Sequence, residues 1–272
     1  MKKSWSIVAV LLVAALALGA CSKKDDDAKS DDSKTTEAPS GGALAGTTVP
    51  VCSDIPYPPL EDFKEGSTTE FTGFDVDLLT DIAKRAGGKV EFKVTPFDGI
   101  IPALNAKDCD IIASAMTITD ERKGQVLFSD PYYDSKQSLV VRKDDADTFK
   151  TLPDLKGKVI GVQSETTGQA YAEKNLPEGA TLKALPGSSD LFTALKAKDI
   201  DAILQDAPVN AWGVKQNPEF SYQQEFDTDE QNGFAVRKDD TETVDWINAG
   251  LKAARADGTY QKLYDQWMTV AK

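Results

Sequence analysis

A ten-residue unit occurs twice in this chain and limits the folds that the chain can adopt. It reads Ala-Leu-Asn-Ala-Lys-Asp-Cys-Asp-Ile-Ile at residues 103–112 and Ala-Leu-Lys-Ala-Lys-Asp-Ile-Asp-Ala-Ile at residues 194–203, with seven of the ten positions identical at an offset of 91 residues. Each copy combines the end of a helix, a charged turn and an apolar run, which predicts a helix-turn-strand unit. Two copies predict two lobes with one unit each. The alternative is chance similarity, because this chemistry is common at helix ends.

A second pair of similar segments indicates how the lobes are joined. Residues 140–145 read Val-Val-Arg-Lys-Asp-Asp and residues 235–240 read Ala-Val-Arg-Lys-Asp-Asp. We expect two short strands side by side that cross between the lobes, with closure by rotation about them. Lobe one would then comprise residues 47–141 plus 235–272, and lobe two residues 142–234. The alternative is two surface strands that end in the same solvated charges.

Strand-like and helix-like segments alternate from residue 47 onward, which predicts an α/β fold with parallel sheet. The predicted strands are short apolar or alternating runs at 48–53, 89–94, 111–115, 158–163 and 202–205. The predicted helices lie at 74–86, 99–107, 167–175, 190–198, 241–256 and 259–270.

The first residues are typical of an exported protein. Lys2 and Lys3 precede an apolar run over residues 7–20, which is short for a membrane helix, the alternative; we therefore predict a signal peptide at 1–20. The run ends Leu-Gly-Ala-Cys, which resembles the lipobox of bacterial lipoproteins and implies lipidation of Cys21. An ordinary cleavage site beside an incidental cysteine is the alternative. Residues 21–46, rich in lysine, aspartate and serine, predict a disordered tether.

The composition argues against several classes of function. The chain has no histidine, which removes the commonest general base and every serine–histidine or cysteine–histidine pair, and we expect no catalytic residues. Two further cysteines without histidine argue against a zinc site. Because Cys52 and Cys109 lie in apolar runs, we expect two buried thiols, although an exported protein can oxidise such a pair. A net charge of −13 argues against nucleic acid as a partner.

Polar residues follow the predicted strands of both lobes, at the carboxyl ends where α/β sheets bind ligands. Arg122 can hold a carboxylate through two parallel hydrogen bonds, and Asp206 offers the opposite charge to an ammonium group. Backbone N–H groups at Thr167 open a predicted helix, where an anion is favoured. One cationic and one anionic end fit a zwitterion. The residues expected around this cleft are Asp54, Tyr57, Phe97, Ser114, Thr117, Arg122, Gln163, Thr167 and Asp206.

Three of these residues have a plain alternative. Tyr57 and Phe97 can flank a ligand side chain or hold a cation, but each can instead be an aromatic residue of the hydrophobic core. Arg122 can instead form a surface ion pair with Asp120 or Glu121, as many exposed arginines do.

Residues 47–272 resemble the family 3 bacterial extracellular solute-binding proteins, the polar amino-acid receptors of ABC importers. The motifs that carry the resemblance are GFDVDLLTDIA at 73–83, FDGIIPAL at 97–104, SAMTITDER at 114–122, FSDPYY at 128–133 and ADGTY at 256–260. The resemblance implies a two-lobed periplasmic-binding-protein-like fold with two crossing hinge strands.

The family also implies roles for the cleft residues. Arg122, helped by Thr117 and Thr167, would grip the ligand's α-carboxylate. Asp206 and the backbone near Ser114 would take the α-ammonium. Tyr57 and Phe97 would flank the side chain, whose far end Asp54 and Gln163 would read. The sequence departs from the family at 164–166, which reads Ser-Glu-Thr instead of Ser-Gly-Thr. Glu165 either adds a carboxylate near the cleft or points to solvent.

We therefore expect a binding protein anchored outside the cytoplasm by an N-terminal lipid. It would work as a monomer without a cofactor, close on a free basic or polar amino acid and deliver it to the membrane permease of an ABC importer. One alternative is an enzyme on the same scaffold, such as a dehydratase of cyclic acids, with Glu165 or Asp206 as acid or base. Another is a receptor subunit that reports the ligand to a sensor.

Overall fold

The computed structural model describes residues 42–269. The predicted signal peptide, Cys21 and the tether up to residue 41 lie outside the described residues. Residues 42–46, predicted as the end of the tether, form a turn instead, in which the amide of Leu44 donates to the carbonyl of Ala86 at 2.9 Å. The Leu44 side chain packs against the first core cluster. The folded body therefore begins earlier than predicted.

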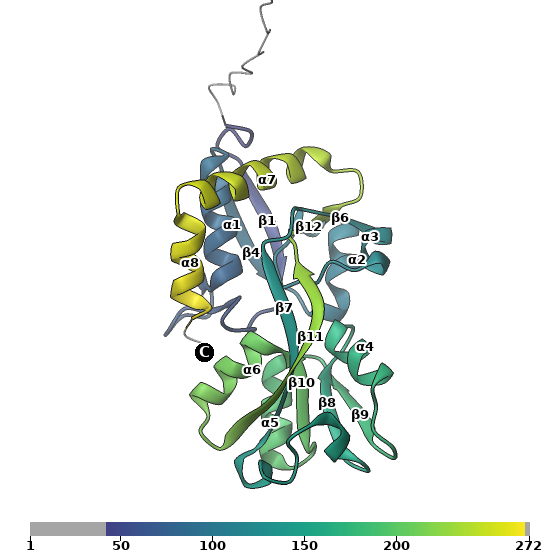
Figure 1. Ribbon diagram of the computed structural model, residues 1–272. Coiled ribbons are helices and arrows are strands. Elements are labelled where there is room, and N and C mark those ends of the chain that lie inside the picture. Colours follow the sequence, from purple (N-terminus) through teal and green to yellow (C-terminus); the bar gives the residue numbers. More distant parts are fainter. Residues whose placement is uncertain (1–41, 270–272) are drawn as a thin grey trace, which may run out of the picture. The chain divides into compact units, whose positions relative to one another are not determined.

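The first sheet has the strand order β4-β1-β5-β12-β6 (Figure 1). β1 is parallel to β4 and β5, whereas β12 is antiparallel to β5 and β6. The strands are β1 (Thr48–Ser53), β4 (Lys89–Val94), β5 (Ile111–Ile112), β6 (Val126–Phe128) and β12 (Ala235–Arg237). The helices packed with this sheet are α1 (Phe74–Arg85), α2 (Ile100–Asn105), α3 (Asp120–Gln125) and α7 (Thr241–Ala256), and α8 (Thr259–Trp267) packs on α1 and α7.

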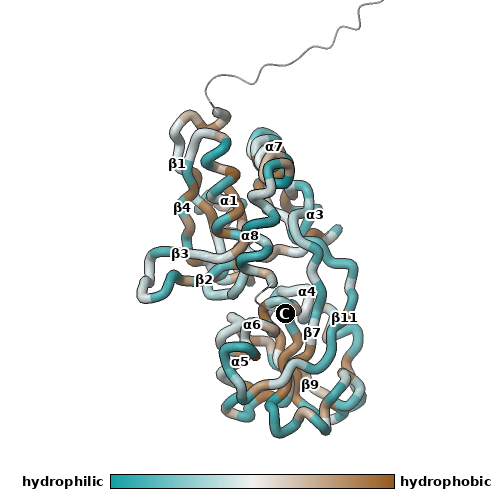
Figure 2. The backbone as a smooth tube through the Cα atoms, turned by 60° about the vertical axis from the view of Figure 1, so that its left-hand side comes forward, coloured by the Kyte–Doolittle hydropathy of each residue, from teal (hydrophilic) through white to brown (hydrophobic). Residues whose placement is uncertain are grey.

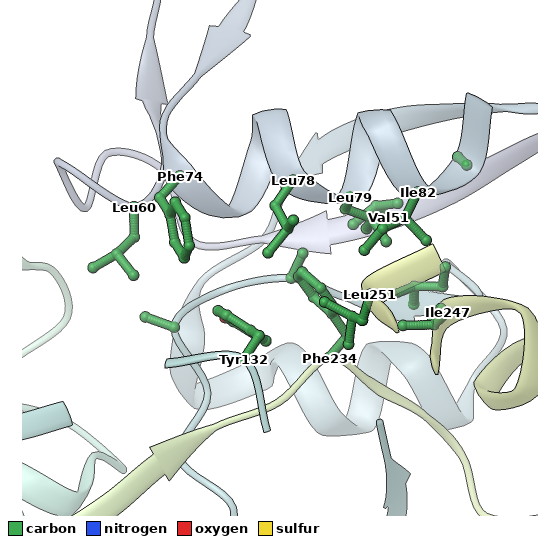
Figure 3. Close-up of a cluster of buried hydrophobic side chains, with 14 of the residues drawn as sticks. Val51, Leu60, Phe74, Leu78, Leu79, Ile82, Tyr132, Phe234, Ile247 and Leu251 are labelled. Carbon is green, nitrogen blue, oxygen red and sulfur yellow. The ribbon is translucent and has the colours of Figure 1, made fainter. Parts of the chain in front are cut away.

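Successive residues of the central strands face opposite sides of the first sheet, because side chains alternate along a strand. Val51 belongs to the core cluster under α1 and α7, and Cys52 to the cluster under α2. Figure 3 shows the first cluster, where Phe74 and Leu78 of α1 point toward Tyr132 and Phe234. Helices thus cover both faces of this sheet, as in α/β proteins.

The second sheet has the strand order β11-β7-β10-β8-β9. β8 is parallel to β9 and β10, and β7 is antiparallel to β10 and β11. The strands are β7 (Tyr133–Arg142), β8 (Val159–Gln163), β9 (Thr181–Leu185), β10 (Ala202–Asp206) and β11 (Phe220–Asn232). The helices packed with it are α4 (Thr167–Lys174), α5 (Ser188–Ala197) and α6 (Ala207–Gln216). In Figure 2 the hydrophobic stretches follow the inner strands such as β7, whereas β11 is mostly hydrophilic.

The remaining elements are short. β2 (Asp62–Phe63) and β3 (Phe71–Thr72) form a two-stranded hairpin. Short 3-10 helices are η1 (Phe97–Gly99), η2 (Lys143–Asp145) and η3 (Leu152–Leu155). Within residues 42–269, no helix is both long and apolar enough to cross a membrane.

The repeated unit predicted from the sequence is present in both sheets, as α2–β5 and as α5–β10. Lys107 and Lys198 occupy the same place after each helix, with left-handed φ values of 68° and 67°. The aspartate that follows each lysine donates its amide back to an alanine carbonyl of the helix, at 3.0 Å and 2.9 Å. The similarity therefore reflects a shared structure rather than chance.

The predicted pairing of residues 140–145 with 235–240 is wrong. Val140 lies opposite Ile203 and Tyr222, whereas Ala235 lies opposite Ile112 and Phe128. The strands that run between the sheets are β7 and β11, which pair along most of their length (Figure 1). Residues 133–141, placed in lobe one from the sequence, consequently pair in the second sheet. The two similar segments occupy equivalent places in the two sheets, each beside the strand of the repeated unit.

Cys52 and Cys109 form a disulfide with Cα atoms 5.7 Å apart, so the prediction of two free thiols is wrong. β1 and β5 pair in parallel with Val51 opposite Ile111, which brings Cys52 beside the turn that precedes β5. Both side chains are buried. Because the two cysteines are 57 residues apart in the sequence, their proximity follows only from the pairing of the strands.

Candidate functional site

All nine cleft residues predicted from the sequence line one cavity between the two sheets. The first sheet and its loops contribute Asp54, Tyr57, Phe97, Ser114, Thr117 and Arg122, and the second contributes Gln163, Thr167 and Asp206, with Ala115 and Thr166 completing the lining. β1, β5, β8 and β10 all end at this cavity, which is the reason that residues far apart in sequence meet there.

Arg122 lies on α3 and is held by carbonyl groups. Its Nη1 donates to the carbonyl of Thr117 at 2.9 Å, and its Nη2 to the carbonyl of Glu165 at 3.0 Å. The guanidinium carbon lies 5.2 Å from the centre of the Phe97 ring, in a cation–π arrangement. Burial lowers the pKa of Arg122, although Asp206 is the largest influence in the opposite direction. Only 9% of the residue is exposed, so it is not the surface arginine of the alternative interpretation.

Asp206 lies at the end of β10 and receives two hydrogen bonds. The Tyr57 hydroxyl donates to its Oδ2 at 2.9 Å, and the Gln137 amide donates to its Oδ1 at 2.7 Å. Burial is the main reason that its pKa rises from 3.8 to about 7, and the nearby charge of Glu230 adds to the rise. A cationic group in the cavity would favour the carboxylate form.

Asp54 and Gln163 meet at another part of the cavity, one from each sheet. The Gln163 amide donates to Oδ2 of Asp54 at 2.6 Å and also to the Pro186 carbonyl at 3.0 Å. Burial raises the pKa of Asp54 to about 6, and the charges of Asp98 and Asp190 act in the same direction. This part of the cavity is therefore an acidic region that a cation would neutralise.

Protein groups occupy hydrogen-bonding positions of the Ser114 hydroxyl. It accepts a hydrogen bond from the amide of Asp54 at 2.9 Å and donates to Oε1 of the fully buried Glu61 at 3.1 Å. Burial is the main cause that holds the pKa of Glu61 well above its usual value. The Ser114 hydroxyl is thus held between the Asp54 amide and the Glu61 carboxyl group.

Glu165, where the sequence departs from the family pattern, does not line the cavity. It is exposed and has a φ of +61°, the left-handed conformation that glycine adopts without strain. Its carbonyl still receives the Arg122 guanidinium. The loop therefore keeps a glycine-like backbone. The Glu165 side chain is exposed, and its charge lies near enough to Arg122 to raise the pKa of that guanidinium.

Two polar residues at the site, Gln137 and Glu230, were not predicted from the sequence. Gln137 is fully buried on β7, and Glu230 lies on β11, where it accepts hydrogen bonds from Thr117 and Thr167 at 3.1 Å and 2.8 Å. Both residues lie within antiparallel strands that run between the sheets. Neither residue follows the end of a parallel strand, which is the signal that located the other polar residues of the site.

A family model described as "Bacterial extracellular solute-binding proteins, family 3" matches residues 49–270. The chain belongs to this family. The solute-binding protein is 38% identical over 232 residues to the ABC transporter arginine-binding protein 1 of Escherichia coli strain K12, a match that covers 83% of this chain and 93% of the relative.

Two solved structures extend the comparison. They are of an ancestral arginine-binding protein, one bound to glutamine and one bound to arginine. Each is 41% identical to the solute-binding protein and covers 81% of this chain and 97% of its own chain, with TM-scores of 0.77 and 0.75. The predicted two-lobed α/β fold is confirmed by these structures and by the two sheets described above.

Proposed function

We propose that this solute-binding protein works as a monomer that binds a free amino acid with a cationic side chain and presents it to the permease of an ABC importer. The observation that carries the proposal is that Arg122 and Asp206, of opposite charge, line one cavity from different sheets. An α-carboxylate would pair with the guanidinium, and an α-ammonium with the Asp206 carboxylate. Because the two groups come from different sheets, a ligand held by both would stabilise the closed arrangement.

The acidic region around Asp54 supports a cationic side chain. Asp54 is half-buried, with Asp98 and Asp190 near enough to raise its pKa. The Gln163 amide proton is already donated to Asp54, which leaves carboxylate lone pairs for the ligand. A guanidinium or ammonium group at this point would relieve the repulsion among the carboxylates. The name of the Escherichia coli relative and the arginine-bound ancestral structure favour the same class.

Calorimetry with the twenty amino acids tests the proposal. We expect arginine, lysine or histidine to bind with a Kd below about 100 μM. Arg122→Met and Asp206→Asn should each weaken binding by about 30-fold or more, because each leaves a charged ligand group without its partner. Arg85→Met, at an exposed ion pair of α1, is the matched control and should bind normally. Binding of glutamine alone would contradict the cationic class, and binding of no amino acid would contradict the whole proposal.

We also propose export by the signal peptide at 1–20 and anchoring outside the cytoplasm through a lipid on Cys21. The motif that ends at this cysteine supports the proposal. Labelling of cells with radioactive palmitate should mark the wild-type chain and not Cys21→Ser, which we expect in the soluble extracytoplasmic fraction. Ser22→Ala serves as the control. Equal labelling of the Cys21→Ser chain would contradict the proposal.

A further inference from the structure

One carboxylate oxygen of Glu230 accepts hydrogen bonds from three side chains that are far apart in the sequence. This oxygen, Oε2, lies 3.1 Å from Oγ1 of Thr117, 2.8 Å from Oγ1 of Thr167 and 3.1 Å from Nε2 of Gln137. Thr117 follows β5 in the first sheet, Thr167 opens α4 beside the second, and Gln137 lies on β7. Glu230 itself lies on β11. The carboxylate therefore joins groups that belong to different sheets.

The two threonine hydroxyls are limited by their single protons. A hydroxyl has one proton to donate and two lone pairs that accept, whereas an ionised carboxylate only accepts. The oxygens of Thr117 and Thr167 lie 3.3 Å apart, so either could donate to the other. Hydrogen bonds to a carboxylate are roughly twice as strong as those between neutral groups. Both protons are therefore drawn to Glu230.

The direction of these protons decides what the hydroxyls offer to a ligand. Thr117 and Thr167 line the cavity together with Asp206. With their protons on Glu230, both hydroxyls keep lone pairs for a ligand and cannot donate to a carboxylate. One lone pair of Thr167 already accepts from Nε2 of Gln137 at 3.4 Å. An ammonium group, which only donates, matches lone pairs and the Asp206 carboxylate alike. The family resemblance implies that Thr117 and Thr167 help Arg122 to hold the ligand's α-carboxylate. In this arrangement their backbone N–H groups can do so, whereas their hydroxyls cannot.

We propose that Glu230 is a positioning residue that turns the hydroxyls of Thr117 and Thr167 into acceptors for the ligand's α-ammonium group. This inference rests on the proposed function and deepens it, because it assigns how one end of the amino acid is recognised. The donors come from both sheets, so the acceptor pair is complete only when the sheets are closed on the ligand. Recognition of the ammonium is thereby tied to closure.

The variant Glu230→Gln tests this role with little change in shape. Glutamine keeps one acceptor oxygen and the volume of glutamate but removes the charge that draws both protons. Glu225→Gln is the matched control on the same strand, since Glu225 forms an exposed ion pair with Lys136 and does not line the cavity. Thermal unfolding of the ligand-free variants confirms that both are folded.

The ligands are L-arginine and 5-guanidinopentanoate, which is arginine without its α-amino group, titrated by calorimetry and by NMR where Kd is millimolar. We expect Glu230→Gln to weaken L-arginine by about tenfold or more, the loss of one charge-assisted interaction. 5-Guanidinopentanoate should bind the variant as well as the wild type, or better. Glu225→Gln should bind both ligands normally. If the wild type binds glutamine instead, glutamine and 4-carbamoylbutanoate replace the pair with the same expectation.

Two results would overturn the inference while leaving the proposed function intact. One is unchanged binding of L-arginine by Glu230→Gln. The other is an equal loss for both ligands, which would show that Glu230 only holds the sheets together. A wild-type protein that binds no amino acid would refute the proposed function itself, and the assignment of Glu230 with it. As an independent check, Glu230→Gln should have a smaller effect in a Thr117→Val background, because the hydroxyl through which it acts is gone.

Discussion

Arg142 holds the turn of the repeated unit in the second sheet in the same way that Arg237 holds it in the first. Arg142 donates through Nη1 to the carbonyl of Ile200 at 2.6 Å and through Nη2 to Asp201 at 3.1 Å. Arg237 donates through Nη1 to the carbonyl of Cys109 at 2.9 Å and through Nη2 to Asp110 at 2.8 Å. The similar segments at 140–145 and 235–240 are explained by this shared contact.

Loss of either arginine should destabilise the protein. Arg142→Met and Arg237→Met each leave an acidic side chain and a buried carbonyl without their donor, and we expect a loss of about 2 kcal/mol in the free energy of unfolding. Urea denaturation measures it. Lys150→Met, at an exposed ion pair, should cost less than about 1 kcal/mol. Losses as small as that control for both arginines would show that these contacts are not structural.

Asp54→Asn should change which amino acids bind. The substitution keeps the shape of the side chain and removes the charge from the acidic region. We expect arginine or lysine to bind about tenfold more weakly or worse, as expected for a lost charge-assisted contact, whereas glutamine changes little. Asp98→Asn removes a neighbouring charge that is exposed and does not line the cavity. If this control weakened arginine as strongly as Asp54→Asn does, the effect would be one of general charge.

The ligand-free protein should lose stability as the pH rises toward neutrality. Burial is the main cause that raises the pKa of both Asp75 and Asp206 from 3.8 to about 7. Between these values the folded protein keeps protons that the unfolded chain releases, so the free energy of unfolding falls as pH increases, by up to about 1.4 kcal/mol per pH unit for each group. Denaturation between pH 4 and pH 8 measures the slope.

Asp75→Asn is the control for this pH dependence. The amide of Ala115 and the hydroxyl of Tyr132 both donate to Oδ2 of Asp75, so one asparagine oxygen can replace that acceptor. We expect a shallower slope in the variant, and an unchanged slope would exclude Asp75 as a source.

Binding of a cationic ligand should show the opposite trend and strengthen as pH rises through about 7, because the α-ammonium needs Asp206 as a carboxylate.

Glu165→Gly should stabilise the loop that receives Arg122. A left-handed backbone conformation costs a residue other than glycine about 1–2 kcal/mol. Glycine avoids this strain, but its greater conformational freedom in the unfolded chain offsets part of the stabilisation. We expect a net increase of up to about 1 kcal/mol in the free energy of unfolding, with amino-acid affinity unchanged. Glu173→Gly, within the exposed part of α4, should destabilise by about 1 kcal/mol. A loss of stability at position 165 would contradict the strain argument.

The sequence alone determined the features that are set by nearby residues. Apolar periodicity located β1 (Thr48–Ser53) and α7 (Thr241–Ala256) at their observed bounds. This is possible because strands and helices each have a characteristic spacing of apolar residues along the sequence. The repeated unit and the polar side chains after each strand predicted residues that line the cavity, since parallel strands in one sheet end at the same edge.

The tertiary structure decided what depends on pairing between distant segments. Three features depend on the register of paired strands. They are the Cys52–Cys109 disulfide, the antiparallel pairing of β7 with β11, and the position of Glu230 beside Thr117 and Thr167. A shift of one residue turns every side chain of a strand to the opposite face. In β11 the register changes twice, between Tyr222 and Gln224 and between Phe226 and Glu230. No local pattern could therefore predict that the carboxylate of Glu230 faces the site.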